Sequence, residues 1–181
     1  MEPDMTHIDT PVPDTIGTPY GGGFYAGEFL LDGKLYALIV APKAEGETTA
    51  QFKTRNTVTK GARSLRDGLA NSNAMANGNH PAAAFCRDLE IGGFTDWYLP
   101  SRHEAALLAE NLMPGEGYVP EQTTAEAFKK GGAEAFAQDW YWTSTEFGSG
   151  SAWVQLFDTG YQGSYGKDWS ARVRAVRKCP L

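Results

Sequence analysis

The sequence predicts an α+β fold, and three observations lead to that prediction. A two-residue turn, Asp32-Gly33, separates two strand-like runs at 24–31 and 34–41. Two helical patterns follow at 81–91 and 102–112, and a series of short strand-like segments completes the C-terminal part. A hairpin, two helices and then a run of short antiparallel strands is the segregated order typical of the α+β class.

The chain of 181 residues is long enough for one domain with a substantial core. Residues 1–20 are polar and contain four prolines, so they cannot build a core of their own. We therefore expect an extended N-terminal arm over 1–20, which makes few contacts with its own domain, and a single domain over 21–181. Two interpretations of the arm stay open: it is a loose tail, or it docks on a neighbouring protein.

The Asp32-Gly33 pair is a strong hairpin signal, because a two-residue turn of this kind needs positive φ at both positions. Apolar residues occupy both faces of the second strand, 34–41, which predicts that this strand lies inside the fold. Turn-forming residues dominate the next part of the chain. There the sequence predicts a polar loop at 42–49, a short strand near 51, and one helical turn near 72–76.

The two helices carry the strongest local signals. Pro81 suits a first helical position, and Gly92 is expected to end that helix. One face of this helix collects four residues at i, i+3, i+4 and i+7: Ala82, Phe85, Cys86 and Leu89. Ser101 and Glu104 form a capping box, in which each side chain satisfies a backbone N–H at the start of the second helix. The stretch 92–104 is therefore expected to organise the domain.

The second half of the chain holds all five tryptophans and most of the predicted strands. After a Pro/Gly loop at 113–121, a modest helix interrupted by two glycines is expected at 124–137. Short strands are then expected at 141–146, 152–157, 161–165 and 172–177. Large aromatic residues most often fill the junction between helices and sheet. We therefore expect one buried cluster of Phe85, Trp97, Leu99, Trp142 and Trp153.

Charge and composition exclude several classes of function. A net charge of −6 argues against a nucleic-acid footprint, which needs a clustered basic face. The one basic cluster fits a solvated or salt-bridged strand face better: Arg172, Arg174, Arg177 and Lys178. No apolar run reaches the roughly 20 residues of a spanning helix, and the acidic N-terminus lacks the pattern of a secretory signal. We expect synthesis in the cytoplasm, no nucleic-acid partner and no membrane insertion.

No catalytic motif stands out. The chain lacks a Gly-x-Ser-x-Gly elbow, a His-Glu-x-x-His zinc motif and a phosphate-binding glycine loop before a helix. His103 beside Glu104 fits a surface histidine next to a capping residue better than an acid–base pair. We therefore expect no catalytic residues, no cofactor and no enzyme activity.

Several blocks occur in the order known from one family. They are Ala-Phe-Cys-Arg-Asp-Leu at 84–89, Gly-Gly-Phe-Thr-Asp-Trp-Tyr-Leu-Pro-Ser at 92–101, Tyr-Trp-Thr-Ser-Thr-Glu at 141–146, Ala-Trp at 152–153 and Arg-Val-Arg-Ala-Val-Arg at 172–177. They resemble a widespread domain of unknown function. It is found in bacterial surface proteins, including the C-terminal domain of a collagen-like adhesin, and in bacteriophage proteins. The resemblance covers about residues 35–178.

The resemblance implies a C-type-lectin-like fold of the sulfatase-modifying-factor variety, with two helices packed on short antiparallel sheets. Asp-Gly-Leu-Ala-Asn at 67–71, with the absence of a signal peptide, looks most like the phage-encoded members. Calcium-dependent lectins of this fold use Glu-Pro-Asn or Gln-Pro-Asp and Trp-Asn-Asp triplets. None of these triplets occurs here, so no metal site is expected.

The formylglycine-generating enzymes of the fold use a reactive cysteine pair near the C-terminus, whereas this chain has only Cys86 and Cys179. The resemblance places these two cysteines on elements that lie side by side. Their Cα atoms are then expected within about 8 Å of each other, whether or not a disulfide forms.

The resemblance implies a bacteriophage virion protein, a binding module of the tail or capsid surface that recognises the host surface or neighbouring virion subunits. Its expected partners are other virion proteins, through the arm, and a glycan or protein of the host surface. We also expect a homo-oligomer. Two alternatives stay open: an enzyme of the formylglycine-generating fold with an unidentified site, and a purely scaffolding or decoration protein.

In this fold the long loop between the late strands usually faces the ligand, and here it is expected between 146 and 170. Amphipathic rings in such a loop give large contact areas at small entropic cost. The candidate binding residues are Phe147, Tyr161, Gln162, Tyr165, Lys167, Asp168 and Trp169. The alternative is that Tyr161, Tyr165 and Trp169 only cover the sheet.

Overall fold

The computed structural model describes residues 8–115 and 121–181 and contains the predicted N-terminal hairpin. Strands β2 (Gly23–Leu31) and β3 (Lys34–Val40) pair antiparallel around the Asp32-Gly33 turn. Both turn residues have positive φ, 50° at Asp32 and 77° at Gly33, as the turn requires. β3 lies inside its sheet, between β2 and β9 (Val176–Pro180), which confirms the prediction from its two apolar faces.

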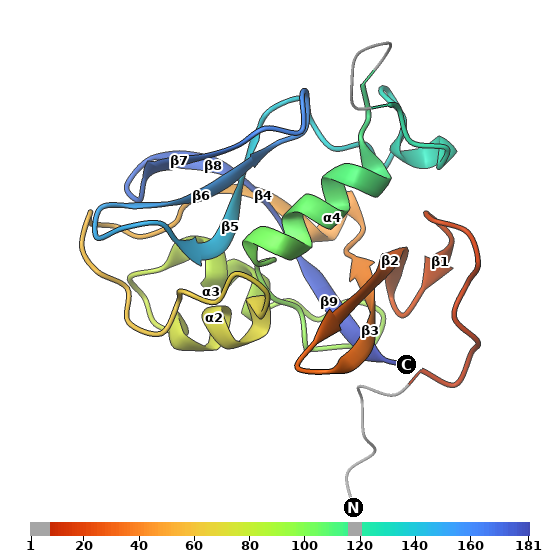
Figure 1. Cartoon of the computed structure of the whole chain (residues 1–181), viewed down its shortest axis with the longest axis horizontal. Coiled ribbons are helices and arrows are strands. Elements are labelled where there is room, and N and C mark those ends of the chain that lie inside the picture. The colour runs from red at the N-terminus through yellow and green to blue at the C-terminus, as the bar shows by residue number, and fades with distance from the viewer. Residues whose placement is uncertain (1–7, 116–120) are drawn as a thin grey trace, which may run out of the picture.

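The described strands form two sheets (Figure 1). The first has the order β1-β2-β3-β9, with β1 at Pro19–Tyr20. The second has the order β4-β8-β5-β6-β7, made of β4 (Glu47–Gln51), β5 (Trp140–Glu146), β6 (Ser151–Leu156), β7 (Gln162–Gly166) and β8 (Ser170–Arg174). The α+β class is confirmed. The expectation of purely antiparallel strands is wrong, because β5 and β8 pair parallel.

The single strand expected at 172–177 is two strands in different sheets. β8 ends at Arg174 and β9 begins at Val176. Between them, the N–H of Ala175 donates to the carbonyl of Gly46 (2.9 Å), and Val176 exchanges two backbone hydrogen bonds with Tyr98. The chain therefore crosses from the second sheet to the first at Ala175. This change of partner leaves no local mark in the sequence.

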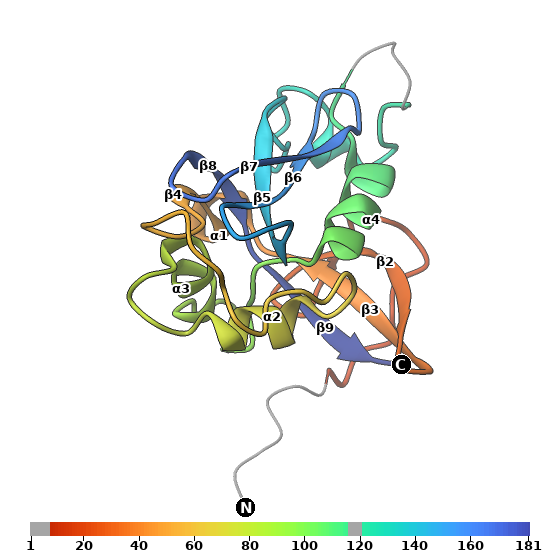
Figure 2. The same cartoon turned by 60° about the vertical axis from the view of Figure 1, so that its left-hand side comes forward.

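The helices cover the sheets from two sides. α4 (Arg102–Leu112) passes between the two sheets in both views, and it packs on β2 and β6 (Figures 1 and 2). α2 (Gly68–Ala74) and α3 (Pro81–Arg87) lie side by side beneath the second sheet. The Asp67 side chain caps α2 by accepting from the N–H of Ala70, so this helix begins before the turn expected near 72–76.

The expectation that Gly92 ends the helix starting at Pro81 is wrong, because α3 ends at Arg87. Ile91 and Phe94 exchange two backbone hydrogen bonds across the Gly92-Gly93 turn, where both glycines have positive φ. Ile91 therefore uses its backbone groups in this turn, and the helix must end before it. Its cap is Asp88, whose N–H donates to the carbonyl of Ala84 (3.0 Å).

Two further local predictions are wrong. The polar loop expected at 42–49 contains α1 (Lys43–Gly46) and most of β4, which exists because it pairs along its whole length with β8. The helix expected at 124–137 is reduced to the 3₁₀ turn η1 (Glu126–Phe128). Gly131 has φ +83°, which no helix residue adopts, so the glycine pair ends helical structure instead of interrupting it. Of the loop expected at 113–121, residues 116–120 lie outside the described residues.

The predicted aromatic cluster is confirmed for three of its five members. Trp97, Leu99 and Trp142 are buried in one cluster that also receives β3 and α3, and Phe85 packs partly buried against it. Trp153 is the exception. It lies half-buried outside this cluster, with the guanidinium of Arg102 over its ring. A second cluster surrounds α4 and contains Phe29, Leu108, Leu112, Phe128 and Phe136.

The expectation of few contacts between the arm and its domain is wrong for residues 8–20. Ile8, Val12 and Ile16 pack on the core, and Tyr20 is itself buried there. The N–H of Gly17 also donates to the carbonyl of Tyr25 (2.8 Å). These apolar residues are few and lie among prolines and polar residues, so the composition of the segment as a whole is polar and does not predict its contacts. The part of the predicted arm at 1–7 lies outside the described residues.

The salt-bridged interpretation of the C-terminal basic cluster is confirmed. Each of the four residues has an acidic partner: Arg172–Asp139, Arg174–Glu134, Arg177–Asp96 and Lys178–Asp67, and Arg174 also pairs with Glu47. Arg174 and Arg177 are fully buried and belong to the core, because aromatic rings flank their guanidinium groups. Cys86 and Cys179 are buried in the cluster of Trp97, and no disulfide joins them. Burial raises the pKa of the Cys86 thiol, which makes it unreactive. Their expected Cα separation stays a prediction.

Candidate binding groove

The capping box at the start of α4 is present as predicted, and it is buried. Glu104 accepts hydrogen bonds from the N–H of Ser101 (2.8 Å) and of Gly68 (3.1 Å) and from the hydroxyl of Tyr98. Burial raises the pKa of its carboxyl, and the hydrogen bonds oppose that rise. These contacts fix the helix start, and the next residues, Arg102 and His103, lie on its half-exposed face.

The β6–β7 hairpin presents one face to the core and one to α4. Opposite residues of an antiparallel pair share a face, so Ala152 and Val154 lie with Tyr165 on the side of the core. Trp153 lies opposite Ser164, and Gln155 lies opposite Gln162. These four side chains therefore share the other face, which looks toward the start of α4.

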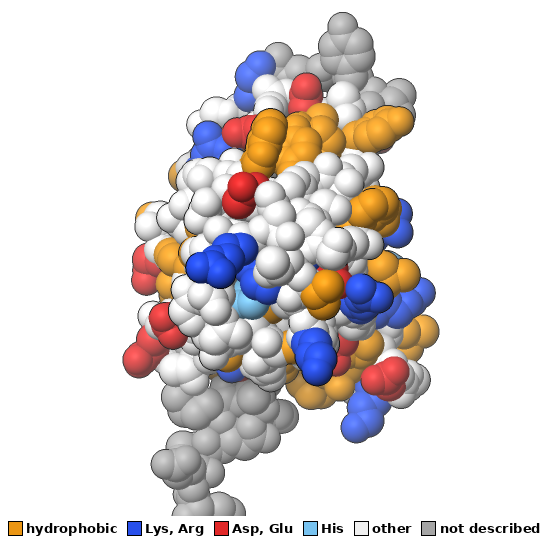
Figure 3. Space-filling view, turned by 90° about the vertical axis from the view of Figure 1, so that its left-hand side faces the viewer, with side chains coloured by type: hydrophobic (Ala, Val, Ile, Leu, Met, Phe, Trp, Pro, Cys, Tyr) orange, Lys and Arg blue, Asp and Glu red, His pale blue; other side chains and the backbone are white. Residues whose placement is uncertain are grey.

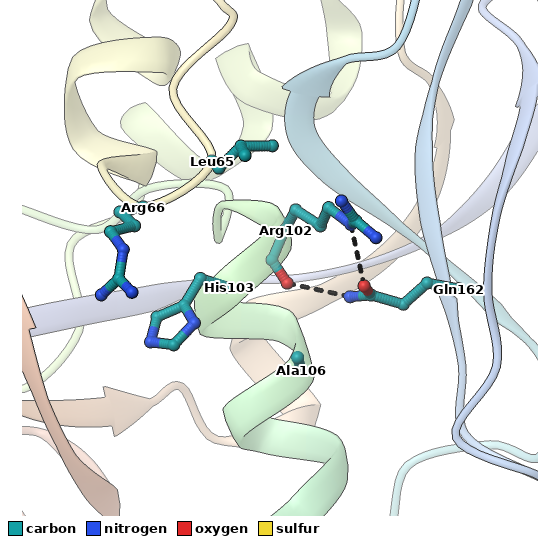
Figure 4. Close-up of a pocket in the computed structure, with 6 residues that line it drawn as sticks. All are labelled: Leu65, Arg66, Arg102, His103, Ala106 and Gln162. Atoms are coloured by element: carbon teal, nitrogen blue, oxygen red, sulfur yellow. Dashed lines mark hydrogen bonds between the residues drawn. The ribbon is translucent and has the colours of Figure 1, made fainter.

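Arg102 joins α4 to this hairpin (Figure 4). Its guanidinium carbon lies 3.7 Å from the centre of the Trp153 ring, and its Nε donates to Oε1 of Gln162 (2.9 Å). Gln162 returns a hydrogen bond from Nε2 to the carbonyl of Arg102 (2.9 Å). The ring of Phe147 packs edge-on against Trp153 at 4.9 Å. A stacked and reciprocally bonded arginine loses little further freedom when a ligand binds.

A groove runs along the exposed side of α4, and we call it the α4 groove. Its centre is a hollow of about 230 Å³ with six lining residues: Leu65, Arg66, Arg102, His103, Ala106 and Gln162. It continues past Ala106 and Gln162 into a hollow of about 490 Å³ beside Gln155, Thr159 and Gly160. On the other side it continues past Leu65 and Arg66 into one of about 480 Å³ beside Leu31 and Asp32. The shared lining residues place the three hollows next to one another.

One wall of the groove, 64–67, has no helix or strand and is held by buried polar side chains. Asn71 of α2 is fully buried, accepts from the N–H of Ser64 (3.0 Å) and donates to its carbonyl (2.8 Å). The hydroxyl of Thr145 also donates to the Ser64 carbonyl (2.8 Å) and accepts from the N–H of Arg102 (3.0 Å). Thr145 thus connects the wall directly to Arg102, at the start of α4.

The groove carries both charges. Arg66, Arg102 and His103 lie at its centre, while Asp32 and Glu110 lie toward its two ends. Burial lowers the pKa of His103, and the nearby charge of Arg66 lowers it further, so the ring is neutral at pH 7. In the described part of the chain no group of three or more His, Cys, Asp or Glu side chains is placed to hold a metal ion.

The family of the chain follows from comparison with known proteins. The model of the Lcl C-terminal domain family matches residues 46–177, which is most of the chain. The chain belongs to this family. No curated protein matches it.

A solved structure shares the fold of this Lcl C-terminal domain. A fimbrial protein from Bacteroides ovatus ATCC 8483 superimposes with a TM-score of 0.51 over 77% of this chain, at 14% sequence identity. The matched part is 35% of that protein, so this chain spans about a third of its length. Within the described residues, no helix is long and apolar enough to cross a membrane.

The expectation of a single long late loop between 146 and 170 is wrong for this Lcl C-terminal domain, because β6 and β7 divide this span into three short connections. The candidate residues therefore lie apart. Phe147 and Gln162 lie on the groove side, one at the β5–β6 turn and one on β7. Tyr165 lies on the opposite face, in ring contact with Trp140 (5.3 Å) and with Trp169 (5.6 Å), which is 63% exposed.

The remaining candidates are also separated. Tyr161 is exposed at the β6–β7 turn, at the end of the hairpin away from Phe147 and Trp169. Figure 3 looks onto the other end, where hydrophobic side chains gather in the upper part of the face. Asp168 is exposed beside Trp169. Lys167 is fully buried in an ion pair with Glu146, so it does not belong to an exposed site.

Sequence reasoning missed most residues of the groove. Arg102, His103 and Ala106 lie in a predicted helix. Only their half-exposed position in the structure distinguishes them from the buried residues of that helix. Leu65 and Arg66 lie in a stretch with weak signals. A signal was available in Ala106, because a small residue on a half-exposed helix face leaves room for a ligand.

His80 belongs to the polar network behind the wall, and it predicts a pH dependence of stability. Its Nδ1 lies 2.8 Å from Oδ1 of Asn77, which accepts a hydrogen bond, and its Nε2 lies 3.1 Å from the hydroxyl of Thr59, which can donate to a neutral ring. Burial, and then the charges of Lys53 and Lys167, lower its pKa from 6.5 to about 4. Between these values the unfolded chain binds more protons at His80 than the folded chain, so stability rises with pH there.

We expect His80 to contribute a loss of about 3 kcal/mol in the free energy of unfolding as the pH falls from about 6.5 to 4. His80→Gln should flatten the curve of unfolding free energy against pH in this window, measured by urea denaturation. His103→Gln is the comparison: the pKa of this half-exposed ring is also lowered, so the variant should flatten the slope too, but by less than His80→Gln. Equal slopes for wild type and His80→Gln would show that the buried ring does not stay neutral.

Proposed function

We propose that this Lcl C-terminal domain is an adhesin-like recognition module without catalytic activity, and that the α4 groove is its binding site. The observation that carries the proposal is Arg102, whose guanidinium is fixed between the Trp153 ring and Gln162 at the centre of an open groove. Prearranged polar groups in a concave surface give orientation and specificity at small entropic cost. The family, and a neighbour of the same fold that is a fimbrial protein, support a role at a surface.

The shape of the groove supports an extended ligand. Two of its three hollows lie along α4, and the third lies next to them between Leu31 and the 64–67 wall. All three are open to solvent, and Ala106 and Ala109 are small residues in the lining of the first two. An enclosed cavity would suit a small molecule. A set of adjacent open hollows with polar side chains suits a glycan chain or an extended peptide of a surface protein.

The setting that we propose is a bacteriophage virion, in the tail or on the capsid surface, and the fold that we propose is the C-type-lectin-like fold. The resemblance of the segment 67–71 to phage-encoded members supports this setting, and the segment forms the cap and first turn of α2 beside the groove wall. A mass-spectrometric inventory of purified particles tests it. We expect to find the chain among the particle proteins. If it is found on bacterial envelopes instead, the proposed virion setting is wrong and the protein acts at a cell surface.

Filling the groove should abolish binding without unfolding the protein. Ala106→Phe places a ring at the junction of two hollows, where the native side chain is half-exposed, so stability should be retained. The probe is an array of bacterial envelope polysaccharides and of surface-protein peptides, screened first with the wild-type chain. We expect Ala106→Phe to bind the probe that the wild-type chain selects from this array with at least tenfold lower affinity. Ala133→Phe, at an exposed position outside the groove, is the matched control.

A second surface competes with the groove and is tested on the same array. Tyr165 and Trp169 form ring contacts on the opposite face of β7. The double variant Tyr165→Ala/Trp169→Ala should bind like the wild type if the groove is the site. Loss of binding in this variant, with retention in Ala106→Phe, would move the site to the aromatic face.

A further inference from the structure

The side chain of Lys167 has an unusual place for a lysine. It is fully buried, and its Nζ lies among three oxygen atoms: Oε2 of Glu146 at 2.7 Å, the carbonyl of Thr57 at 2.8 Å and the hydroxyl of Thr59 at 3.3 Å. An ammonium group has three N–H donors and no acceptor, so three oxygen atoms match it fully. The ring of Phe52 adds a cation–π contact at 5.7 Å.

Glu146 connects this ammonium group to the groove wall. Its Oε2 accepts from the N–H of Thr59, its Oε1 accepts from Nε of Arg63 (2.9 Å), and its own N–H donates to the carbonyl of Ala62. Burial alone would raise the pKa of this carboxyl, but the hydrogen bonds from Lys167, Thr59 and Arg63 lower it overall. The carboxylate thus stays charged while it joins β5 to the segment before the wall.

The segment that these contacts hold is long and irregular. Residues 52–66 contain neither helix nor strand, yet they end in Ser64, Leu65 and Arg66, which line the groove. A loop of this length is uncommon in a small domain and needs its own set of polar contacts. A carboxylate, a carbonyl and a hydroxyl converge on one point, as they would around a bound cation, and the Lys167 ammonium occupies that point.

We propose that Lys167 is a built-in cation that holds the 52–66 segment against β5, and so is a positioning residue of the α4 groove. Its effect on binding rests on the function proposed above, whereas its effect on the segment does not. The backbone of Lys167 supports this role, because its carbonyl accepts from the N–H of Lys53 (3.0 Å) and its N–H donates to the carbonyl of Gly150 (3.0 Å). Backbone and side chain of one residue therefore hold the start and the middle of the segment.

The test is hydrogen exchange of individual amides by NMR in wild type and in Lys167→Met, which keeps the length of the side chain and removes the charge. We expect the amides of Thr59, Ser64 and Asp67 to exchange at least tenfold faster, while amides of β3 and β6 keep their rates. Lys43→Met is the matched control. Lys43 also donates to a backbone carbonyl and pairs with a carboxylate, but it lies outside the groove. It should leave these three amides unchanged.

A second variant covers the case in which Lys167→Met does not fold, since it leaves the buried Glu146 with only the exposed Arg63 as a charged partner. Lys167→Met/Glu146→Gln removes both charges and should fold, with the same three amides still exchanging faster. Unchanged exchange in a folded variant, or an equal loss of protection in β3 and β6, would overturn the proposal. Binding of the array probe should fall at least fivefold in the folded variant. If Ala106→Phe leaves binding intact, the proposed function fails while the exchange result still decides the role of Lys167.

Discussion

Asp96→Ala is expected to lower the free energy of unfolding by about 3–5 kcal/mol, because it leaves a buried guanidinium without its counter-ion. Arg177 is fully buried, and its Nε and Nη2 atoms donate to the two carboxylate oxygens of Asp96 at 2.6 and 2.9 Å. Its remaining nitrogen donates to the carbonyl of Gly21 (3.2 Å), and the ring of Phe94 lies 3.8 Å from its carbon. The Asp96 side chain is 23% exposed whereas that of Arg177 is fully buried, so water that enters from the Asp96 side would solvate the guanidinium only in part.

The effect should come from the unpaired charge, and a double variant tests this. Asp96→Ala/Arg177→Met removes the charge together with its partner, and it should be more stable than the single variant. Asp139→Ala is the matched surface control. It breaks the exposed pair with Arg172 and should cost less than about 1 kcal/mol. Urea denaturation of the three variants measures the differences. If Asp96→Ala is at least as stable as Asp96→Ala/Arg177→Met, the unpaired guanidinium is hydrated and carries no large cost.

The parts of the fold that the sequence predicted are those specified by neighbouring residues. Asp32-Gly33 is a turn whatever surrounds it, since both positions take positive φ. Ser101 and Glu104 bond the backbone within three residues, so the start of α4 follows from local chemistry. In both cases, the contacts that decide the structure lie inside the pattern itself.

The parts that were missed depend on distant partners. β4 is a strand because β8 lies beside it, and the end of β8 is set by Tyr98, which captures Val176 for the other sheet. Lys167 looks like a surface residue of a loop until Glu146 and Thr57 are brought to it from far along the chain. The groove follows the same rule. Arg102 becomes a binding candidate only when the β6–β7 hairpin places Trp153 and Gln162 against it.

Trp97→Ala is expected to lower the free energy of unfolding by about 3–5 kcal/mol, the cost of a large cavity in a close-packed core. Trp97 is fully inaccessible to solvent, and its indole N–H donates to the carbonyl of Phe94 (3.0 Å). Its own carbonyl accepts from Nη1 of Arg87 (2.8 Å) and so connects the end of α3 to this stretch. Removing the ring therefore empties the junction of α3 with the first sheet and takes from the Phe94 carbonyl one of its two donors, the other being the N–H of Ile91.

Thermal unfolding provides the measurement, and a second tryptophan provides the control. In a domain of this size each kcal/mol corresponds to a shift of about 2–4 °C in Tm, so Trp97→Ala should lower Tm by roughly 10 °C or more. Trp169→Ala removes an identical side chain from a site that is 63% exposed, and it should lower Tm by less than about 3 °C. Trp97→Phe keeps part of the side-chain volume and loses the indole donor, so its decrease in Tm should lie between those of Trp97→Ala and Trp169→Ala. Equal shifts for Trp97→Ala and Trp169→Ala would mean that the stretch from 92 to 104 is not the organiser of the core.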